Sequence, residues 1–137
     1  MIPFCSWIWT SYQLYISCLT ILPVKFHIKS VTQLDSLGLS SIQLQSTIPS
    51  SIFELNNLEI LNLSPNNLSG TMELEMFLQL KSLRALYLSS NRLSLLTNST
   101  VNASSHNLYT LSLRSCNLRV FPDFLHNPNQ LKMLTQL

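Results

Sequence analysis

Residues 58–70 read LEILNLSPNNLSG, and the frame of this stretch recurs along most of the chain. Counting Leu58 as position one, leucine occupies positions one, four, six and eleven, asparagine position nine and glycine position thirteen. Further copies begin at residues 34, 83, 108 and 131, so successive copies start 24, 25, 25 and 23 residues apart. A frame that repeats at a near-constant interval predicts a solenoid of stacked units rather than one globular core.

The frame resembles that of the leucine-rich repeats, in which a short strand leads into a turn held by an asparagine. We therefore predict an α/β-type solenoid, a right-handed coil with short parallel strands on its concave face and irregular or 3₁₀ turns on its convex face. About four and a half repeats fill residues 31–137, and the fifth copy ends within its strand. Residues 1–30 form a separate hydrophobic segment.

Position nine of the frame is expected to hold each turn. The amide of Asn66 is predicted to lie inside the turn, donating to and accepting from backbone groups. Ile42 and Cys116 take this position in the first and fourth repeats. For Cys116 we predict a structural role as a weak donor rather than a reactive one. At position thirteen, Gly70 permits a positive φ where the chain turns back.

The outer segments differ from repeat to repeat. Residues 50–55 predict a 3₁₀ or helical turn with Ser51 and Glu54 at capping-box spacing. Ile52 and Leu55 are expected to point inward. The other outer segments are predicted to be a short helix over residues 74–80, an irregular surface loop over residues 97–107 and a further turn over residues 123–125.

Residues 1–24 are strongly apolar and uncharged, and Lys25 ends this run. Three interpretations stay open. The segment is a secretory signal, although basic residues after Met1 and an Ala-x-Ala site are missing. Alternatively it is a membrane span, diluted by polar residues and two prolines, or it is translated from an imprecise gene start. Cys5 and Cys18 share this ambiguity, and the three cysteines of the chain form no zinc or disulfide pattern.

Residues that carry chemistry are scarce in this chain. Of its 137 residues 46% are apolar and 10% charged, and its net charge of +2 comes without a basic patch for nucleic acid. The two glycines, Gly38 and Gly70, are too few for phosphate-binding or nucleophile-elbow loops. The histidines fall at unrelated positions, and Glu73 and Glu75 fit a solvated pair better than an acid and a base. We predict no enzymatic activity, no cofactor, no metal site and no nucleic-acid partner.

A binding surface is the better candidate for function. Side chains alternate along a strand, so positions three, five, seven and eight are expected to face solvent. Stacking aligns them in columns on the concave side of the sheet, which we call the strand face. Its predicted ligand-binding residues are Ile60, Asn62, Ala85, Tyr87, Thr110, Ser112 and Arg114. Tyr87 and Arg114 are the expected anchors because aromatic and Arg side chains dominate interface energies. The alternative is that they only cover the sheet.

Four Asn-x-Ser/Thr triplets mark predicted N-glycosylation sites, at Asn62, Asn67, Asn98 and Asn102. Asn98 and Asn102 fall in the polar loop and are expected to be the most accessible. A glycan on Asn62 would screen part of the strand face. Repeats rich in asparagine generate such triplets by chance, yet four in a short chain favour the secretory pathway and an extracellular location.

Residues 34–134 resemble the extracellular repeats of plant receptor-like proteins of the disease-resistance type. The signature LxxLxLxxNxLxGxIP is matched in part by each of the first four repeats, most closely in residues 50–55, 58–70, 89–96, 113–118 and 121–125. The resemblance implies a glycoprotein on the outer face of the plasma membrane with no kinase of its own. Such a protein binds a protein or peptide ligand and signals in plant defence through a partner receptor kinase.

The chain also departs from this family. The cysteine-bearing cap, the further repeats, the membrane span and the cytoplasmic tail of the family are not recognisable, so we expect a fragment. Membrane attachment would come through residues 1–24 or through a C-terminal region missing from this sequence. Two alternatives stay open, a secreted leucine-rich inhibitor of microbial cell-wall-degrading enzymes and a non-functional truncated fragment with an uncapped coil.

Overall fold

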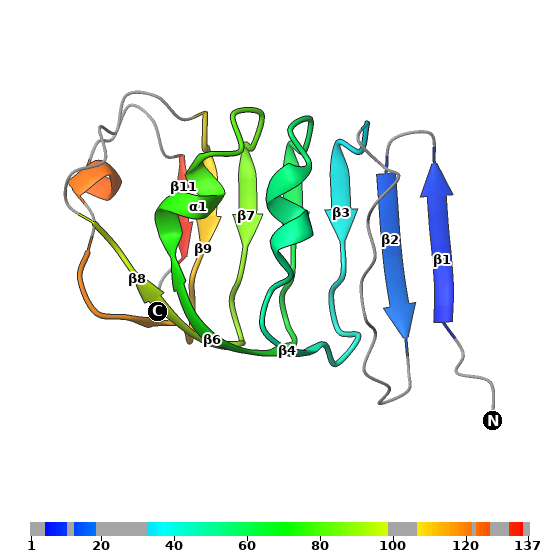
Figure 1. Ribbon diagram of the computed structural model, residues 1–137, viewed down its shortest axis with the longest axis horizontal. Coiled ribbons are helices and arrows are strands. Elements are labelled where there is room, and N and C mark those ends of the chain that lie inside the picture. The colour runs from blue at the N-terminus through cyan, green and yellow to red at the C-terminus, as the bar shows by residue number, and fades with distance from the viewer. Residues whose placement is uncertain are drawn as a thin grey trace.

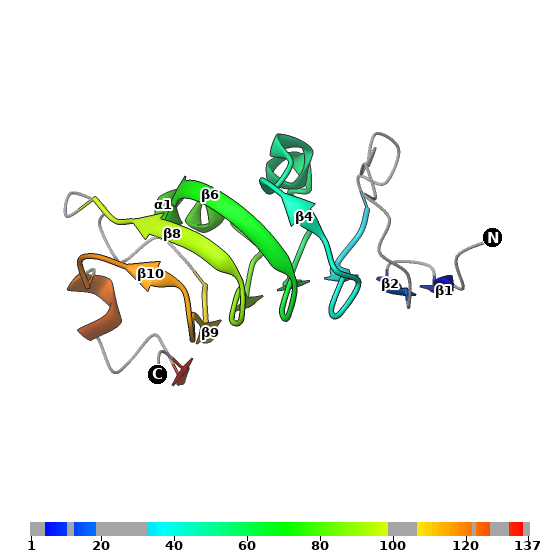
Figure 2. The same ribbon diagram turned by 90° about the horizontal axis from the view of Figure 1, so that it is seen from below.

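The computed structural model describes residues 5–10, 13–18, 33–98, 107–121, 123–126 and 132–135. Two sheets run along the coil, and short helices cover one face of the larger sheet (Figures 1 and 2). The larger sheet has seven strands in the order β1 (Cys5–Thr10), β2 (Gln13–Cys18), β3 (Ser36–Gly38), β5 (Ile60–Asn62), β7 (Ala85–Tyr87), β9 (Thr110–Ser112) and β11 (Met133–Thr135). The smaller sheet has four strands in the order β10 (Asn117–Leu118), β8 (Arg92–Leu96), β6 (Asn67–Glu73) and β4 (Gln45–Ser46).

The repeat strands stand at the predicted period. Each of β3, β5, β7, β9 and β11 belongs to one copy of the frame, and strands of consecutive copies pair in parallel. Their central leucines are register partners, and Leu37, Leu61, Leu86 and Leu111 are each 0% exposed. Leu134 continues this row in β11 but is 37% exposed. The predicted leucine-rich repeat fold is confirmed, with a core made of stacked leucines.

In the second and third repeats, asparagine at position nine ties the turn to the repeat before it. Nδ2 of Asn66 donates to the carbonyl oxygens of Leu39 and Leu63, at 2.7 Å in both cases. Its Oδ1 accepts from the backbone amides of Ile42 at 3.2 Å and Leu44 at 3.1 Å. The role predicted for Asn66 is therefore confirmed.

The next repeat follows the same plan. Asn91 donates to the carbonyl oxygens of Leu63 at 3.1 Å and Leu88 at 3.0 Å, and it accepts from the amide of Leu68 at 3.0 Å. Gly70 has a φ of 101°, as predicted. The backbone conformation therefore favours glycine, and a Cβ at this residue would also lie 2.9 Å from Cγ2 of Thr47, whose methyl group would have to shift.

Within the described residues, the outer side carries three short helices: η1 (Ser50–Glu54), α1 (Leu74–Leu78) and η3 (Asp123–His126). They confirm the predicted turn, helix and further turn, and Ile52 and Leu55 are buried as expected. The predicted capping box is wrong. The N-cap of η1 is Pro49, which places Ser51 inside the helix, and the Ser51 hydroxyl is buried without a partner among the described residues. Of the predicted loop, residues 99–106 lie outside the described residues.

Strands β1 and β2 lie within residues 1–30, where the sequence pattern predicts no strand. They pair antiparallel, and β2 pairs in parallel with β3, so the larger sheet continues beyond the first repeat. The three interpretations of residues 1–30 stay predictions. In the part of the chain that the structure describes, no helix is both long and apolar enough to cross a membrane.

Candidate functional site

The strand face is the surface of the larger sheet opposite η1 and α1 (Figure 2). Strand pairing aligns its residues in two columns. Position three gives Ser36, Ile60, Ala85, Thr110 and Met133, and position five gives Gly38, Asn62, Tyr87, Ser112 and Thr135. Neighbouring strands of a sheet lie about 4.8 Å apart. The structure therefore brings the predicted residues of β5, β7 and β9 together on one surface, and Arg114 follows directly after β9.

The accessible part of the strand face begins at β5. Ser36 is 3% exposed and Gly38 is buried, so the expectation that positions three and five face solvent is wrong for the first repeat. Among the predicted ligand-binding residues Ile60 is 39% exposed and Arg114 is exposed. The remaining members are half-buried: Asn62, Ala85, Tyr87, Thr110 and Ser112.

Hydrogen bonds hold three polar side chains on this face in place, those of Asn62, Ser89 and Ser112. Oδ1 of Asn62 accepts from the backbone amide of Ser64 at 3.0 Å and from its hydroxyl at 3.4 Å. The hydroxyls of Ser89 and Ser112 are hydrogen-bonded to each other. Oγ of Ser89 also accepts from the backbone amide of Arg114 at 3.0 Å. These groups are therefore ordered before any ligand binds.

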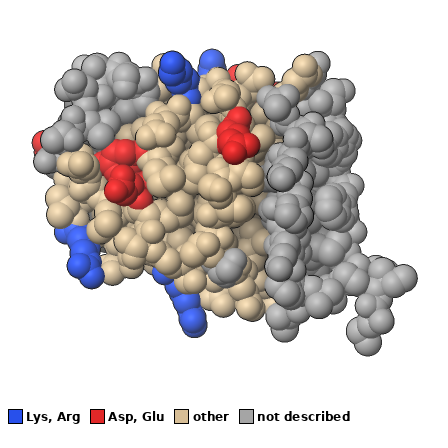
Figure 3. Space-filling model, viewed as in Figure 1, with Lys and Arg blue, Asp and Glu red and all other residues tan. Residues whose placement is uncertain are grey.

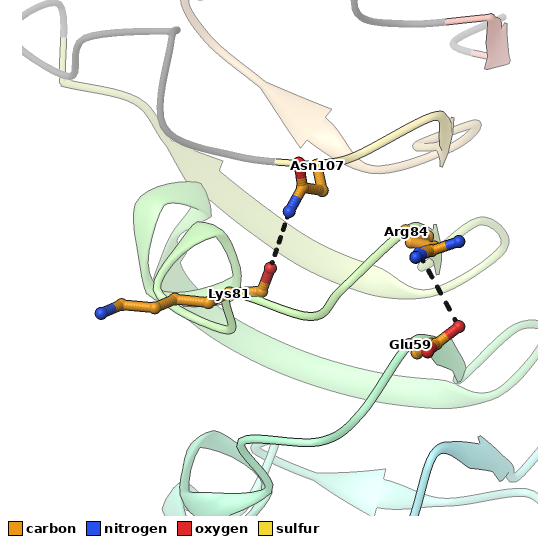
Figure 4. Close-up of polar contacts among 4 residues, drawn as sticks. All are labelled: Glu59, Lys81, Arg84 and Asn107. Atoms are coloured by element: carbon orange, nitrogen blue, oxygen red, sulfur yellow. Dashed lines mark hydrogen bonds and ion pairs between the residues drawn. The ribbon is translucent and has the colours of Figure 1, made fainter.

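A row of position-two side chains lines the edge of the strand face where the strands begin, and we call it the border row. Its members are Asp35, Glu59, Arg84, Tyr109 and Lys132. Nε of Arg84 lies 3.7 Å from Oε2 of Glu59 (Figure 4), and the Lys132 ammonium lies 5.3 Å from the ring centre of Tyr109. Exposed contacts of this kind contribute little to stability. Sequence reasoning missed the border row, although the repeat period contains it at position two.

Backbone hydrogen bonds make the border row regular. The carbonyl oxygen of Glu59 accepts from the amides of Arg84 at 2.8 Å and Ala85 at 3.0 Å. The carbonyl oxygens of Asp35, Arg84 and Tyr109 likewise each accept hydrogen bonds from two consecutive backbone amides of the following repeat. Each strand start is therefore fixed to its neighbour at two consecutive amides.

Charged residues on this side separate along the coil. The acidic ones, Asp35 and Glu59, belong to the first two repeats, whereas Arg84, Arg114 and Lys132 belong to the third, fourth and fifth. The helix side carries only scattered charges among neutral residues (Figure 3). Within the described residues, no three His, Cys, Asp or Glu side chains cluster closely enough to bind a metal ion.

Cys116 replaces the asparagine in the fourth repeat. Its Sγ donates to the carbonyl oxygen of Leu88 at 3.3 Å, which is one of the acceptors that Asn91 also uses. The predicted weak donation is therefore confirmed. Burial raises the pKa of the Cys116 thiol from 9.0 to about 11.

We expect Cys116 to react slowly with iodoacetamide at mildly alkaline pH. The thiolate is the nucleophile, and a rise of the pKa from 9.0 to about 11 lowers the thiolate fraction about 100-fold. Because the folded pKa is the higher one, the thiol stabilises the fold below about pH 9, and this contribution is lost as the pH rises towards 11. Alkylation rates in a Cys5→Ser/Cys18→Ser chain, native and in urea, measure the effect. Equal rates in the two states would contradict it.

The predicted glycosylation sites differ in their surroundings. Asn67 and Asn98 are exposed, Asn62 is half-buried in the strand face, and Asn102 lies outside the described residues. The backbone amide of Asn98 donates to Oε1 of Glu75 at 2.6 Å, so the main chain at this site is tied to α1.

Fold and strand face define a class of protein. Residues 32–93 match the family described as "Leucine rich repeat", and the chain has the leucine-rich repeat fold. Its repeats resemble receptor-like proteins of Arabidopsis thaliana. The similarity is 35% identity over 100 residues to Receptor like protein 23 and 37% over 103 residues to Receptor-like protein 6. These alignments cover 73% and 74% of this chain but 11% and 10% of the two relatives.

Solved structures with this fold include plant receptor ectodomains. The LRR ectodomain of the receptor kinase SOBIR1 from Arabidopsis thaliana is 26% identical with a TM-score of 0.65, over 98% of this chain and 78% of that one. The plant peptide hormone receptor RGFR1, solved in complex with RGF2, is 31% identical with a TM-score of 0.56, over 76% of this chain and 20% of that one.

Proposed function

We propose that this chain is a ligand-recognition module of a plant cell-surface receptor-like protein. The strand face binds a protein or peptide on the outer side of the plasma membrane. The protein acts in plant defence, has no kinase of its own and signals through a partner receptor kinase. The proposal rests on the aligned residues of the strand face, and similarity to receptor-like proteins and receptor ectodomains supports it.

Tyr87 and Arg114 are the anchors of this site. Among the described residues, neither side chain makes a hydrogen bond, whereas the side chains of Asn62, Ser89 and Ser112 nearby are hydrogen-bonded. Tyr and Arg side chains are enriched among the residues that dominate binding energy. Because their surroundings are ordered in advance, little entropy is lost there when a ligand binds.

The separation of charge gives the ligand a direction. Acidic groups of the ligand are favoured over the third to fifth repeats, near Arg84, Arg114 and Lys132, and basic groups over Asp35 and Glu59. An extended peptide that crosses the strands meets both ends of this gradient. Similarity to RGFR1, a plant peptide hormone receptor solved in complex with RGF2, supports a peptide as the ligand.

A peptide library displayed on phage tests this function with the full chain as the target. We expect selected peptides to lose binding at least about tenfold, or roughly 1.4 kcal/mol, on Tyr87→Ala and on Arg114→Ala. Lys81→Ala is the matched control, because Lys81 is exposed outside the strand face. Raising the salt concentration should weaken binding of the peptides with acidic segments. Selected peptides that ignore both strand-face substitutions would refute the proposal.

A further inference from the structure

A groove lies outside the strand face, where the turns of the first two repeats meet. It has a volume of about 400 Å³ and is open to solvent, within the range of roughly 300–1,000 Å³ typical of small-molecule sites. Figure 2 looks onto this edge of the coil, beside β4 and β6. The residues that line the groove are Ser41, Gln43, Gln45, Pro65, Asn66 and Asn67.

The groove exists because the two turns follow different paths. Ser41 and Gln43 have φ values of 56° and 54°. Pro65 occupies the position of Ser41 in the next repeat, and the proline ring fixes φ near −65°, so it cannot copy that turn. The strands that leave the turns also differ, since β4 has two residues and β6 has seven.

Unused polar side chains surround this space. Asn66 is fully engaged by its four backbone partners. The side chains of Gln43, Gln45 and Asn67, by contrast, are exposed and make no hydrogen bond with other described residues. Gln45 and Asn67 are register partners in the β4–β6 pair, so they lie side by side on the same face. The exposed Pro65 adds an apolar wall.

Asn67 also begins the triplet Asn67-Leu68-Ser69, an acceptor sequence for N-glycosylation. We propose that the groove seats the first N-acetylglucosamine of a glycan attached to Asn67. The amides of Gln43 and Gln45 bind its acetamido and hydroxyl groups, and Pro65 packs against its ring. The groove is thus filled by the protein's own modification rather than by a free ligand.

The attachment is a group transfer from a lipid-linked oligosaccharide diphosphate. Nδ2 of Asn67 forms a bond to C1 of the sugar while the bond from C1 to the diphosphate breaks. The lipid diphosphate leaves with the bonding electrons, and the transferase removes the displaced amide proton. This step requires the secretory route of the proposed function.

Asn98 offers a built-in comparison. It is exposed and begins the triplet Asn98-Ser99-Thr100, but it does not line the groove. A glycan there has no seat among the groove residues. The two sites should therefore carry glycans of the same kind with different accessibility.

The test uses the full chain secreted behind an added signal peptide from cells that make only high-mannose glycans. Peptide mass spectrometry measures occupancy at Asn67 and Asn98. An endoglycosidase that cuts between the two core N-acetylglucosamines then measures access. On the native protein we expect release at Asn67 to be about tenfold slower than at Asn98, the factor given by roughly 1.4 kcal/mol of binding energy. After denaturation the two rates should be equal.

Gln43→Ala/Gln45→Ala should raise native release at Asn67 and leave occupancy and the rate at Asn98 unchanged. Gln79→Ala, an exposed glutamine outside the groove, is the matched control. A secreted chain without a glycan on Asn67, or equal native rates at Asn67 and Asn98, would overturn the proposal. The chain without the added signal peptide tests the secretory route separately. If Asn67 and Asn98 are glycosylated in the chain with the added signal peptide but not in the chain without it, the proposed function fails and the proposal for the groove stands.

Discussion

Asn66→Ala is expected to lower the free energy of unfolding by about 3–5 kcal/mol, because each buried backbone group left unpaired costs roughly 1–3 kcal/mol. The substitution removes the hydrogen bonds that Asn66 makes with the carbonyl of Leu39 and with the amides of Ile42 and Leu44. It also removes one to the carbonyl of Leu63, which keeps its hydrogen bond from Asn91. All four of these partner residues are buried. The loss is a large part of the roughly 5–15 kcal/mol that a typical domain has in total.

Asn67→Ala is the matched control for this experiment. Asn67 is the next residue, exposed, and without a side-chain hydrogen bond to the other described residues. In protein made in bacteria, which carries no glycan, we expect a change within about 0.5 kcal/mol. Urea unfolding followed by circular dichroism measures both variants. Similar stabilities of the two would show that the asparagine contacts do not hold the turns.

Phe77→Ala is expected to cost about 3–5 kcal/mol, the usual range for a fully buried aromatic residue. Phe77 is 0% exposed and is the largest side chain that α1 buries against the leucine core. Its ring meets that of Phe53 edge to face, with centroids 5.2 Å apart and an interplanar angle of 65°. A helix of five residues is not stable alone, so losing Phe77 should release α1 from the coil.

A double-mutant cycle with Phe53→Ala separates the ring contact from simple burial. We expect a coupling energy of about 0.5–1.5 kcal/mol between the two rings. Gln79→Ala, on the exposed residue that follows α1, should change stability by less than about 0.5 kcal/mol. A coupling energy of zero would mean that the two rings contribute independently. A loss of stability in Phe77→Ala that is smaller than the loss in Phe77→Leu would contradict the burial argument.

The repeat period is the reason that so much of the fold can be predicted from the sequence. Leucines at positions one, four and six mark the strands, and Asn66 and Gly70 mark the turn chemistry, because each position has one dominant physical requirement. The capping box failed for a similarly local reason. Pro49 precedes η1 as its N-cap, so Ser51 enters the helix too late for its hydroxyl to cap it.

The smaller sheet could not be predicted in the same way. Its strands pair position twelve of one repeat with position ten of the next, as in Gln45 with Asn67 and Ser69 with Arg92. These residues share no side-chain pattern, because the pairing depends on how the turns stack and not on burial of one face. Strands β1 and β2 could not be predicted either, because their apolar residues fit a secretory signal or a membrane span as well as they fit a strand.

The strand face could be predicted in part. The columns at positions three and five follow from strand alternation alone, and pairing confirms their alignment. Burial of Ser36 could not be predicted, since alternation says nothing of what covers the first repeat. The border row escapes the alternation rule because it precedes the strands, and the groove depends on backbone angles at Ser41 and Gln43 that the frame does not encode.

The two hydrogen bonds that each border-row carbonyl accepts give the strand face a regular spacing along the coil. Because two consecutive amides fix every strand start, the strands cannot slide, and their spacing of about 4.8 Å becomes a fixed pitch. A polyproline II chain rises about 3.1 Å per residue and returns to the same side every third residue, or about 9.3 Å. Two strand spacings measure about 9.6 Å. A ligand in this conformation that lies across the strands would therefore point every third side chain at the strand face. Successive side chains of this set would lie two repeats apart, and the ligand would not need to bend.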